Sequence, residues 1–261
     1  MPVTATTTLA SPVYVLCDAH LGVAPAEQEQ LLWSFLRHVA AQGTGTVLLN
    51  GDMFEFWFEW GNVVPQAGVR LLAAVGAVAE RGIPVLWIKG NHDCWGGEVL
   101  RAQSGAEYID GPWEGLLAGW RSHAAHGDGL RPRLDAGYRR LRAVIRHRWA
   151  VRAFRWLHPE WGAALARATS HTSRNVRPRD GGEGLRAVAH ERLAADRSLE
   201  LVIFAHTHVA QLERKSHEAG IYANPGAWLD APTFLKITPE RVALCRWDGA
   251  HESVDVSIDR G

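Results

Sequence analysis

Short apolar runs recur along the chain, and each of them ends in a cluster of polar residues. The runs span residues 13–17, 46–49, 85–88 and 201–204. They lead into Asp18, Asn50-Gly51-Asp52, Gly90-Asn91-His92-Asp93 and His206-Thr207-His208. Continuous apolar runs of this length suit strands that are buried on both faces of a sheet. Residues 27–41 and 63–81, between the first three runs, carry apolar side chains at helical spacing, so the pattern predicts an α/β sandwich with parallel strand pairs.

The pattern changes after His208, where four short strands separated by turns are predicted. They span residues 221–223, 233–237, 242–246 and 254–258. Short strands at this spacing are typical of antiparallel structure. We expect them to form a β-meander that closes a second sheet.

A segment from residue 130 to 197 differs from both patterns, because it is rich in arginine and mostly helical. Between Arg131 and Asp180 there are thirteen arginines and three acidic residues, an excess of ten positive charges in a chain whose formal net charge is zero. Apolar residues recur in this segment at steps of four, three, four and four: Leu134, Tyr138, Leu141, Ile145 and Trp149. This spacing predicts one continuous helical face flanked by arginines.

Two interpretations of this basic segment remain open from its residues. Amphipathic helices with Trp and Arg can clamp acyl chains at a membrane surface. The same apolar faces can also pack the segment onto the core. The origin of the segment next to His126-Gly127-Asp128, a cluster with a candidate metal ligand, favours a role in substrate binding.

Length and composition limit the class of protein. The 261 residues fit one domain, 1–261, that carries the helical insertion 130–197. The zero net charge gives no general attraction to nucleic acid or to membranes. The three cysteines form no CxxC pair, which argues against a disulfide framework or structural zinc and favours a reducing cytoplasm. We expect the N-terminal residues to be a short tail rather than a signal peptide, and no run approaches the ~20 apolar residues of a membrane span.

The polar clusters carry residue types that bind metal ions. In open α/β sheets, ligands bind beyond the carboxyl ends of strands, which is where these clusters fall. Any single Asp-x-His is more often a capping or solvated group, but five clusters in order are difficult to explain in that way. Mixed Asp, Asn and His ligands suit Mn²⁺, Fe or Zn²⁺ better than Ca²⁺ or Mg²⁺. The candidate ligands are Asp18, His20, Asp52, Asn91, His126, His206 and His208, with Asp52 placed to bridge two ions.

These motifs, in this order, resemble those of the calcineurin-like metallophosphoesterase superfamily. They are Asp18-x-His20, Gly51-Asp52, Gly90-Asn91-His92-Asp93, His126 and His206-x-His208. The resemblance implies a two-sheet αββα sandwich with two metal ions. One ion would be held by Asp18, His20, Asp52 and His208, and the other by Asp52, Asn91, His126 and His206. It also implies that His92 is the general acid for the leaving oxygen and that Asp93 orients it.

The second motif narrows the resemblance. The sequence Gly51-Asp52-Met53-Phe54-Glu55-Phe56-Trp57, with the arginine-rich insertion, is similar to the UDP-2,3-diacylglucosamine diphosphatases of lipid A synthesis. This resemblance implies hydrolysis of UDP-2,3-diacylglucosamine to 2,3-diacylglucosamine 1-phosphate and UMP, with Mn²⁺ as cofactor and Fe or Zn²⁺ as alternatives. The insertion would be a lid over the acyl chains, with Tyr138, Leu141, Ile145 and Trp149 binding the lipid. Ser170, Arg174 and Arg177 would contact the substrate phosphates.

The same resemblance implies a cytoplasmic enzyme that associates peripherally with the inner membrane, with no nucleic acid and no obligate protein as partner. The chain departs from the family at His92, where well-known members carry arginine. Two alternatives therefore accompany the glycolipid hydrolase. One is a phosphodiesterase or nuclease of the same superfamily, and the other is a scaffold with an inactive site.

Overall fold

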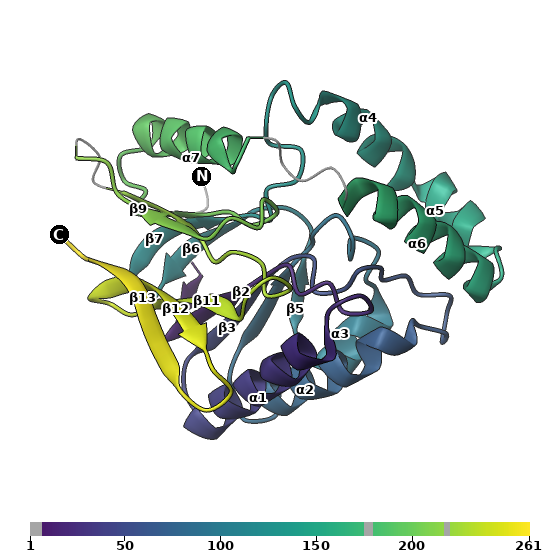
Figure 1. Ribbon diagram of the computed structural model, residues 1–261, viewed down its shortest axis with the longest axis horizontal. Helices are drawn as coiled ribbons and strands as arrows, with labels where there is room; N and C mark the ends of the chain where they lie inside the picture. Colours follow the sequence, from purple (N-terminus) through teal and green to yellow (C-terminus); the bar gives the residue numbers. More distant parts are fainter. Residues whose placement is uncertain (1–6, 175–179, 217–219) are drawn as a thin grey trace, which may run out of the picture.

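The computed structural model describes residues 7–174, 180–216 and 220–261, and within them the chain forms two packed sheets with helices on the outside (Figure 1). The seven-stranded sheet has the order β13 (Glu252–Asp259), β12 (Arg241–Trp247), β11 (Thr233–Ile237), β2 (Val13–Leu16), β3 (Thr46–Asn50), β4 (Val85–Ile88) and β5 (Glu107–Ile109). The six-stranded sheet has the order β1 (Thr8–Leu9), β6 (Trp113–Leu117), β7 (Trp120–Ala124), β8 (Leu201–Ile203), β10 (Ile221–Asn224) and β9 (Gln211–Glu213).

Alternation along each central strand divides its side chains between two cores. Val15 and Leu48 point into the space between the sheets, where they meet Ile203 and Ala223 of the other sheet. Their neighbours on the same strands pack against α1 (Ala26–Gln42), α2 (Val69–Ala79), which follows a 3₁₀ turn at Gln66–Gly68, and α3 (Glu98–Ser104). Because successive side chains point to opposite faces and both faces are buried, the central strands appear in the sequence as continuous apolar runs.

The outer face of the six-stranded sheet is covered by α7 (Glu183–Ala195). Leu185, Ala189 and Leu193 of this helix pack on Val202 and Tyr222. The layers are therefore helix, sheet, sheet and helix, and the expected αββα sandwich is confirmed. However, α7 lies within the predicted insertion 130–197, and the structure makes it a layer of the sandwich instead.

The meander after His208 does not close the second sheet as expected. Its strands β11, β12 and β13 extend the seven-stranded sheet, because β11 pairs antiparallel with β2 through Leu235 and Val15. Only β9 and β10 join the six-stranded sheet, where β10 runs parallel to β8. The expectation of one meander in one sheet was wrong.

The insertion itself consists of α4 (Ala136–Ile145), α5 (Arg148–Arg155) and α6 (Pro159–Arg174), which lie together at one side of the sandwich (Figure 1). The predicted continuous face from Leu134 to Trp149 was wrong, because α4 ends at Ile145 and α5 begins three residues later. The His147 side chain accepts a hydrogen bond from the Trp149 amide and so caps the start of α5. Among the helices of the described residues, none has the length and apolar character needed to cross a membrane.

Candidate metal centre

The predicted ligand residues lie on loops that follow five strands. Asp18 and His20 follow β2, Asp52 follows β3, Asn91 follows β4, His126 follows β7, and His206 and His208 follow β8. The strands β2, β3 and β4 are mutually parallel, as are β7 and β8. Parallel strands end at the same edge of a sheet, so these side chains come together there.

Asp18, His20 and His208 form the first ligand group. The Oδ1 atom of Asp18 lies 3.8 Å from His20 Nε2 and 3.5 Å from His208 Nε2, and the two Nε2 atoms are 3.3 Å apart. Ligand atoms ~2.0–2.2 Å from a tetrahedral ion lie about 3.4 Å from one another. Asp18 Oδ1 is buried and has no hydrogen-bond partner. A buried, unpaired carboxylate oxygen at the centre of such a group is what a metal ion would satisfy.

Asp52, Asn91, His126 and His206 form the second ligand group. His126 Nε2 lies 3.2 Å from Asp52 Oδ2 and 3.2 Å from Asn91 Oδ1. Ligand atoms of Asp52, His126 and His206 all lie within 4.8 Å of one another. The two groups are adjacent, since the His206 amide donates to Asp18 Oδ2 at 3.1 Å.

Outer hydrogen bonds orient the histidines of both groups. Nδ1 of His126 donates to the Asn50 carbonyl at 2.9 Å, and Nδ1 of His20 lies 3.1 Å from Glu55 Oε2. His208 Nδ1 lies 3.3 Å from a carboxylate oxygen of Asp230. With Nδ1 tied to an oxygen acceptor, each ring presents Nε2 to the centre, which is the usual arrangement of metal-binding histidines. The residues present therefore fit divalent metal ions.

The backbone at the centre is unusual. Five of the ligand residues have a positive φ: Asp18, His20, Asp52, His206 and His208. Non-glycine residues rarely adopt this left-handed conformation, and they cluster at functional sites when they do. The loops are held in place by backbone hydrogen bonds, such as those from the Asp18 amide to the Gly51 carbonyl at 3.1 Å and from the His20 amide to the Asp52 carbonyl at 3.0 Å.

The charges of the centre are strongly coupled. Burial raises the pKa of Asp18, but the His208 ring, 3.5 Å from its Oδ1 atom, and the charge of His126 outweigh it and lower the pKa to about 2. Burial also raises the pKa of Asp52. The charge of His126 outweighs this effect, so the pKa of Asp52 falls well below its usual value. Burial lowers the pKa of His208, but its hydrogen bonds to carboxylates raise it to about 10. Burial and the charge of His126 lower the pKa of His206 to about 4. The two carboxylates are therefore ionised, and His208 holds a proton that a bound metal ion would have to displace.

His92 lies at the edge of the second ligand group. Its Nε2 atom is 4.0 Å from Asp52 Oδ2, and its Nδ1 atom donates to the Glu55 carbonyl at 2.8 Å. Glu55 thus orients two rings, His92 through its carbonyl and His20 through its carboxylate. The sequence analysis assigns no role to Glu55, although a carboxylate three residues after Asp52 is a signal for one.

Asp93 does not orient His92 as expected. Its carboxylate accepts hydrogen bonds from the Gly90 amide at 2.7 Å, from the Met53 amide at 3.0 Å and from Trp87 Nε1 at 3.1 Å. The Asp93 side chain is fully buried, and its hydrogen bonds hold the loops after β3 and β4 together. Asp93 therefore supports the position of the loops, and the contact expected with the His92 ring is made by the Glu55 carbonyl instead.

The predicted lipid-binding residues of the insertion divide into two sets. Tyr138 donates to Asp128 Oδ2 at 2.7 Å, so its side chain faces the sandwich, and Ile145 is partly buried, with its backbone carbonyl accepting from Trp95 Nε1 at 3.2 Å. Leu141 and Trp149 are 56% and 60% exposed. The backbones of Ser170 and Arg174 lie in α6, and Arg177 lies outside the described residues.

An aromatic cluster attaches the insertion to the sandwich. The ring of Phe154 on α5 lies 4.8 Å from Phe58, 5.8 Å from Trp60 and 6.4 Å from Trp95, measured between centroids. The insertion also carries exposed apolar side chains in addition to Leu141 and Trp149, namely Leu134, Val144, Trp156, Trp161 and Leu165.

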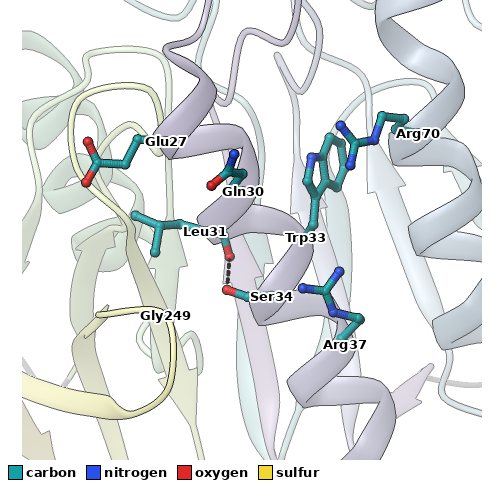
Figure 2. Close-up of a pocket in the computed structure, with 8 residues that line it drawn as sticks. All are labelled: Glu27, Gln30, Leu31, Trp33, Ser34, Arg37, Arg70 and Gly249. Carbon is teal, nitrogen blue, oxygen red and sulfur yellow. Dashed lines mark hydrogen bonds between the residues drawn. The ribbon is translucent and has the colours of Figure 1, made fainter.

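A cavity of about 540 Å³ lies away from this centre, on the outer surface of α1 (Figure 2). It is lined by residues of α1 together with Arg70 of α2 and Gly249, and the Arg70 guanidinium lies 5.6 Å from the Trp33 ring. The predicted ligand residues do not line it, so the chemistry is assigned to the strand-end centre.

The αββα sandwich and its strand-end cluster of carboxylates and histidines define a metal-dependent phosphoesterase. Residues 11–210 match the calcineurin-like phosphoesterase family, and the chain belongs to this family. Membership of this family makes the chain, in its expected class, a metal-dependent phosphoesterase rather than an inactive scaffold.

Two relatives of this chain share the name UDP-2,3-diacylglucosamine hydrolase. The chain is 30% identical over 168 residues to a UDP-2,3-diacylglucosamine hydrolase of Porphyromonas gingivalis, an alignment that covers 63% of this chain and 64% of the relative. It is 28% identical over 212 residues to the hydrolase of the same name from Neisseria meningitidis serogroup C, covering 80% of this chain and 86% of that one. Among solved structures, a zinc complex of Vps29 from Entamoeba histolytica aligns over 96% of this chain and 99% of its own, with 14% identity and a TM-score of 0.47.

Proposed function

We propose that this chain is a dinuclear-metal hydrolase that cleaves the pyrophosphate of UDP-2,3-diacylglucosamine to give 2,3-diacylglucosamine 1-phosphate and UMP. The proposal rests on one observation. The insertion, which lies next to the two ligand groups, exposes apolar side chains. The alignment to named UDP-2,3-diacylglucosamine hydrolases over 80% of this chain supports it.

Each part of the proposed substrate has a matching part of the structure. Two bound divalent ions, Mn²⁺ in this proposal, would supply a nucleophile at neutral pH and charge for the phosphate oxygens. Asp52 would be shared by the two ions in this proposal, since it belongs to the second ligand group and the hydrogen bond from the His20 amide to its carbonyl keeps it next to the first group. The exposed apolar face of the insertion would cover acyl chains, and its arginines suit phosphate oxygens.

His92 is proposed to hold the proton for the leaving oxygen. Because Nδ1–H is fixed on the Glu55 carbonyl, the proton that His92 can release is the one on Nε2, the atom that faces Asp52. A water molecule that has lost one proton to solvent would attack one phosphorus as hydroxide, the P–O bond to the leaving group would break, and the released oxygen would take the proton of His92 Nε2.

The exposed face of the insertion supports a peripheral position at the cytoplasmic face of the inner membrane. Trp156 is 91% exposed, and it lies on the segment that also carries Arg148, Arg152 and Arg155. Tryptophan with flanking arginine suits the interface between acyl chains and anionic headgroups. Sedimentation with anionic vesicles, but not with neutral ones, is the expected result.

His92 favours a second candidate, a phosphodiesterase with a different substrate. A pyrophosphate releases a phosphate, which needs little protonation, whereas an alkyl phosphodiester releases an alkoxide that needs a general acid. A histidine with a fixed Nδ1 and an available Nε2 is suited to the second case.

Product analysis distinguishes the two candidates. Metal-reconstituted protein is incubated with UDP-2,3-diacylglucosamine or with an alkyl phosphodiester, and the products are identified by mass spectrometry, with Asp52→Ala as the inactive control. Release of UMP and the lipid phosphate, at a kcat/KM well above that for the diester, supports the proposal. Turnover of the diester alone would replace it with the second candidate.

A further inference from the structure

Asp128 is the point at which the helical insertion meets the metal centre. It follows His126 by two residues, and its carboxylate is buried. Its Oδ2 atom accepts hydrogen bonds from Tyr138 Oη at 2.7 Å, from Arg142 Nη1 at 3.0 Å and from Arg146 Nη2 at 3.4 Å. All three donors belong to α4 or to its C-terminal cap, so the first helix of the insertion is held on a loop of the centre.

Arg146 also reaches a second loop of the centre. The same Nη2 atom donates to the Gly90 carbonyl at 3.0 Å, directly before Asn91. The Arg146 side chain is only 23% exposed, and charge-assisted hydrogen bonds are stronger in such surroundings than in water. One guanidinium therefore joins the loop after β4, which carries Asn91, to the loop after β7, which carries His126.

Gly90 is packed tightly against Asp52. A Cβ atom on Gly90 would lie 2.0 Å from Asp52 Oδ1 and 2.5 Å from the Asp52 amide nitrogen. The His92 amide donates to the same Oδ1 atom at 2.8 Å. A shift of the Gly90 carbonyl would therefore displace the Asp52 carboxylate together with Asn91.

We propose that Arg146 is a positioning residue for the second ligand group, which fixes the spacing between Asn91, His126 and Asp52. The proposal rests on the metal roles proposed for that group. Without the guanidinium, the loops after β4 and β7 lose their common donor, and a metal ion at the second group binds more weakly. In the part of the chain that the structure describes, this guanidinium makes no hydrogen bond to the loops of Asp18, His20 and His208. The ion at the first group, which these three residues would hold together with the shared Asp52, therefore loses less affinity than the ion at the second group.

Calorimetric titration with Mn²⁺ tests this role without a substrate. Metal-free wild-type protein is compared with Arg146→Ala, Arg146→Lys and the control Arg140→Ala, which removes an exposed arginine of the same helix. Arg146→Ala is expected to weaken one of two binding steps by about 10–100-fold, the usual effect of removing an outer-shell partner. Arg146→Lys should retain part of the affinity, because an ammonium is a point charge without the planar fork. Arg140→Ala should match the wild type.

Activity on bis-p-nitrophenyl phosphate and the melting temperature of the metal-free protein provide the second readout. Arg146→Ala is expected to recover wild-type kcat at saturating Mn²⁺ with an unchanged metal-free melting temperature. Two unaltered binding steps would overturn the proposal, as would equal weakening of both steps with a lower metal-free melting temperature. A wild type that binds no Mn²⁺ would overturn the metal roles as well. A wild type that binds two ions but leaves the glycolipid intact would overturn only the proposed substrate, and the comparison of variants still decides the role of Arg146.

Discussion

Trp149 provides a direct test of the proposed glycolipid substrate. It is 60% exposed on α5, and the guanidinium groups of Arg148 and Arg152 lie 5.1 and 5.2 Å from its ring. A tryptophan side chain presents ~150–250 Å², so on the order of 100 Å² of Trp149 is available to an acyl chain. At ~25 cal/mol per Å² of apolar surface, covering this area contributes about 2–3 kcal/mol.

The variant Trp149→Ala is therefore expected to lower kcat/KM for a long-chain UDP-diacylglucosamine by about 10–100-fold. Activity on bis-p-nitrophenyl phosphate should stay at the wild-type level, because this small diester has no acyl chain for α5 to cover. The control Val254→Ala removes an apolar side chain that is 59% exposed on β13, an element of the sandwich. It should leave both activities unchanged.

The assay measures kcat/KM on both substrates, with thermal melting as the check of folding. An equal loss on the lipid and on the soluble diester would show that Trp149 acts through the structure of the insertion. Undiminished activity on the lipid would show that the exposed face does not bind acyl chains. A deletion of the whole insertion is less informative, because it also removes the Arg146 contact with Gly90.

Three further substitutions and a change of pH test the candidate metal centre. Asp52→Ala is expected to abolish turnover and lower the metal content, and full activity with one ion per chain would rule out the two-ion arrangement. His92→Ala should lower the rate on an alkyl phosphodiester by about 10²–10⁴, with a smaller loss for a nitrophenolate leaving group; equal losses would exclude proton donation. Gly90→Ala should disrupt metal binding, because its Cβ would lie 2.0 Å from Asp52 Oδ1, whereas Gly137→Ala meets nothing within 4 Å and should bind metal normally in the same titration. Burial lowers the pKa of His208, but its hydrogen bonds to carboxylates raise it from 6.5 to about 10, so a metal ion must displace its proton. Metal affinity should therefore rise as the pH increases toward about 10, and calorimetry in buffers of different ionisation enthalpy should detect the released protons; an affinity independent of pH would contradict this coupling.

Features that depend on local pattern could be predicted from the sequence. The apolar run 85–88 is β4, and Asn91 follows it at the strand end as expected. The pairing of strands depends on residues far apart in the chain. The run 233–237 carries apolar side chains on both faces, Phe234 on one and Leu235 and Ile237 on the other, which fits either sheet, and only its contact with β2 places it in the seven-stranded one.

Contacts among polar side chains could not be predicted, because the path of each loop decides them. Glu55 and Asp93 are both carboxylates beside the centre, yet Glu55 orients His20 while Asp93 braces Gly90. The helix break before α5 has a similar cause. The apolar spacing continues from Ile145 to Trp149, but the His147 side chain accepts a hydrogen bond from the Trp149 amide, and this local hydrogen bond competes with a continuous helix.

The left-handed backbone of five ligand residues places activity in opposition to stability. A non-glycine residue in this conformation costs on the order of 1–3 kcal/mol, and natural domains are stable by only ~5–15 kcal/mol. His208, which is partly exposed, illustrates the conflict, since glycine there would relieve the backbone and remove a ligand. In a protein that descends from this one and no longer needs catalytic activity, replacing these residues would increase stability. Loss of the centre would then be thermodynamically favourable, and only selection for turnover would oppose it.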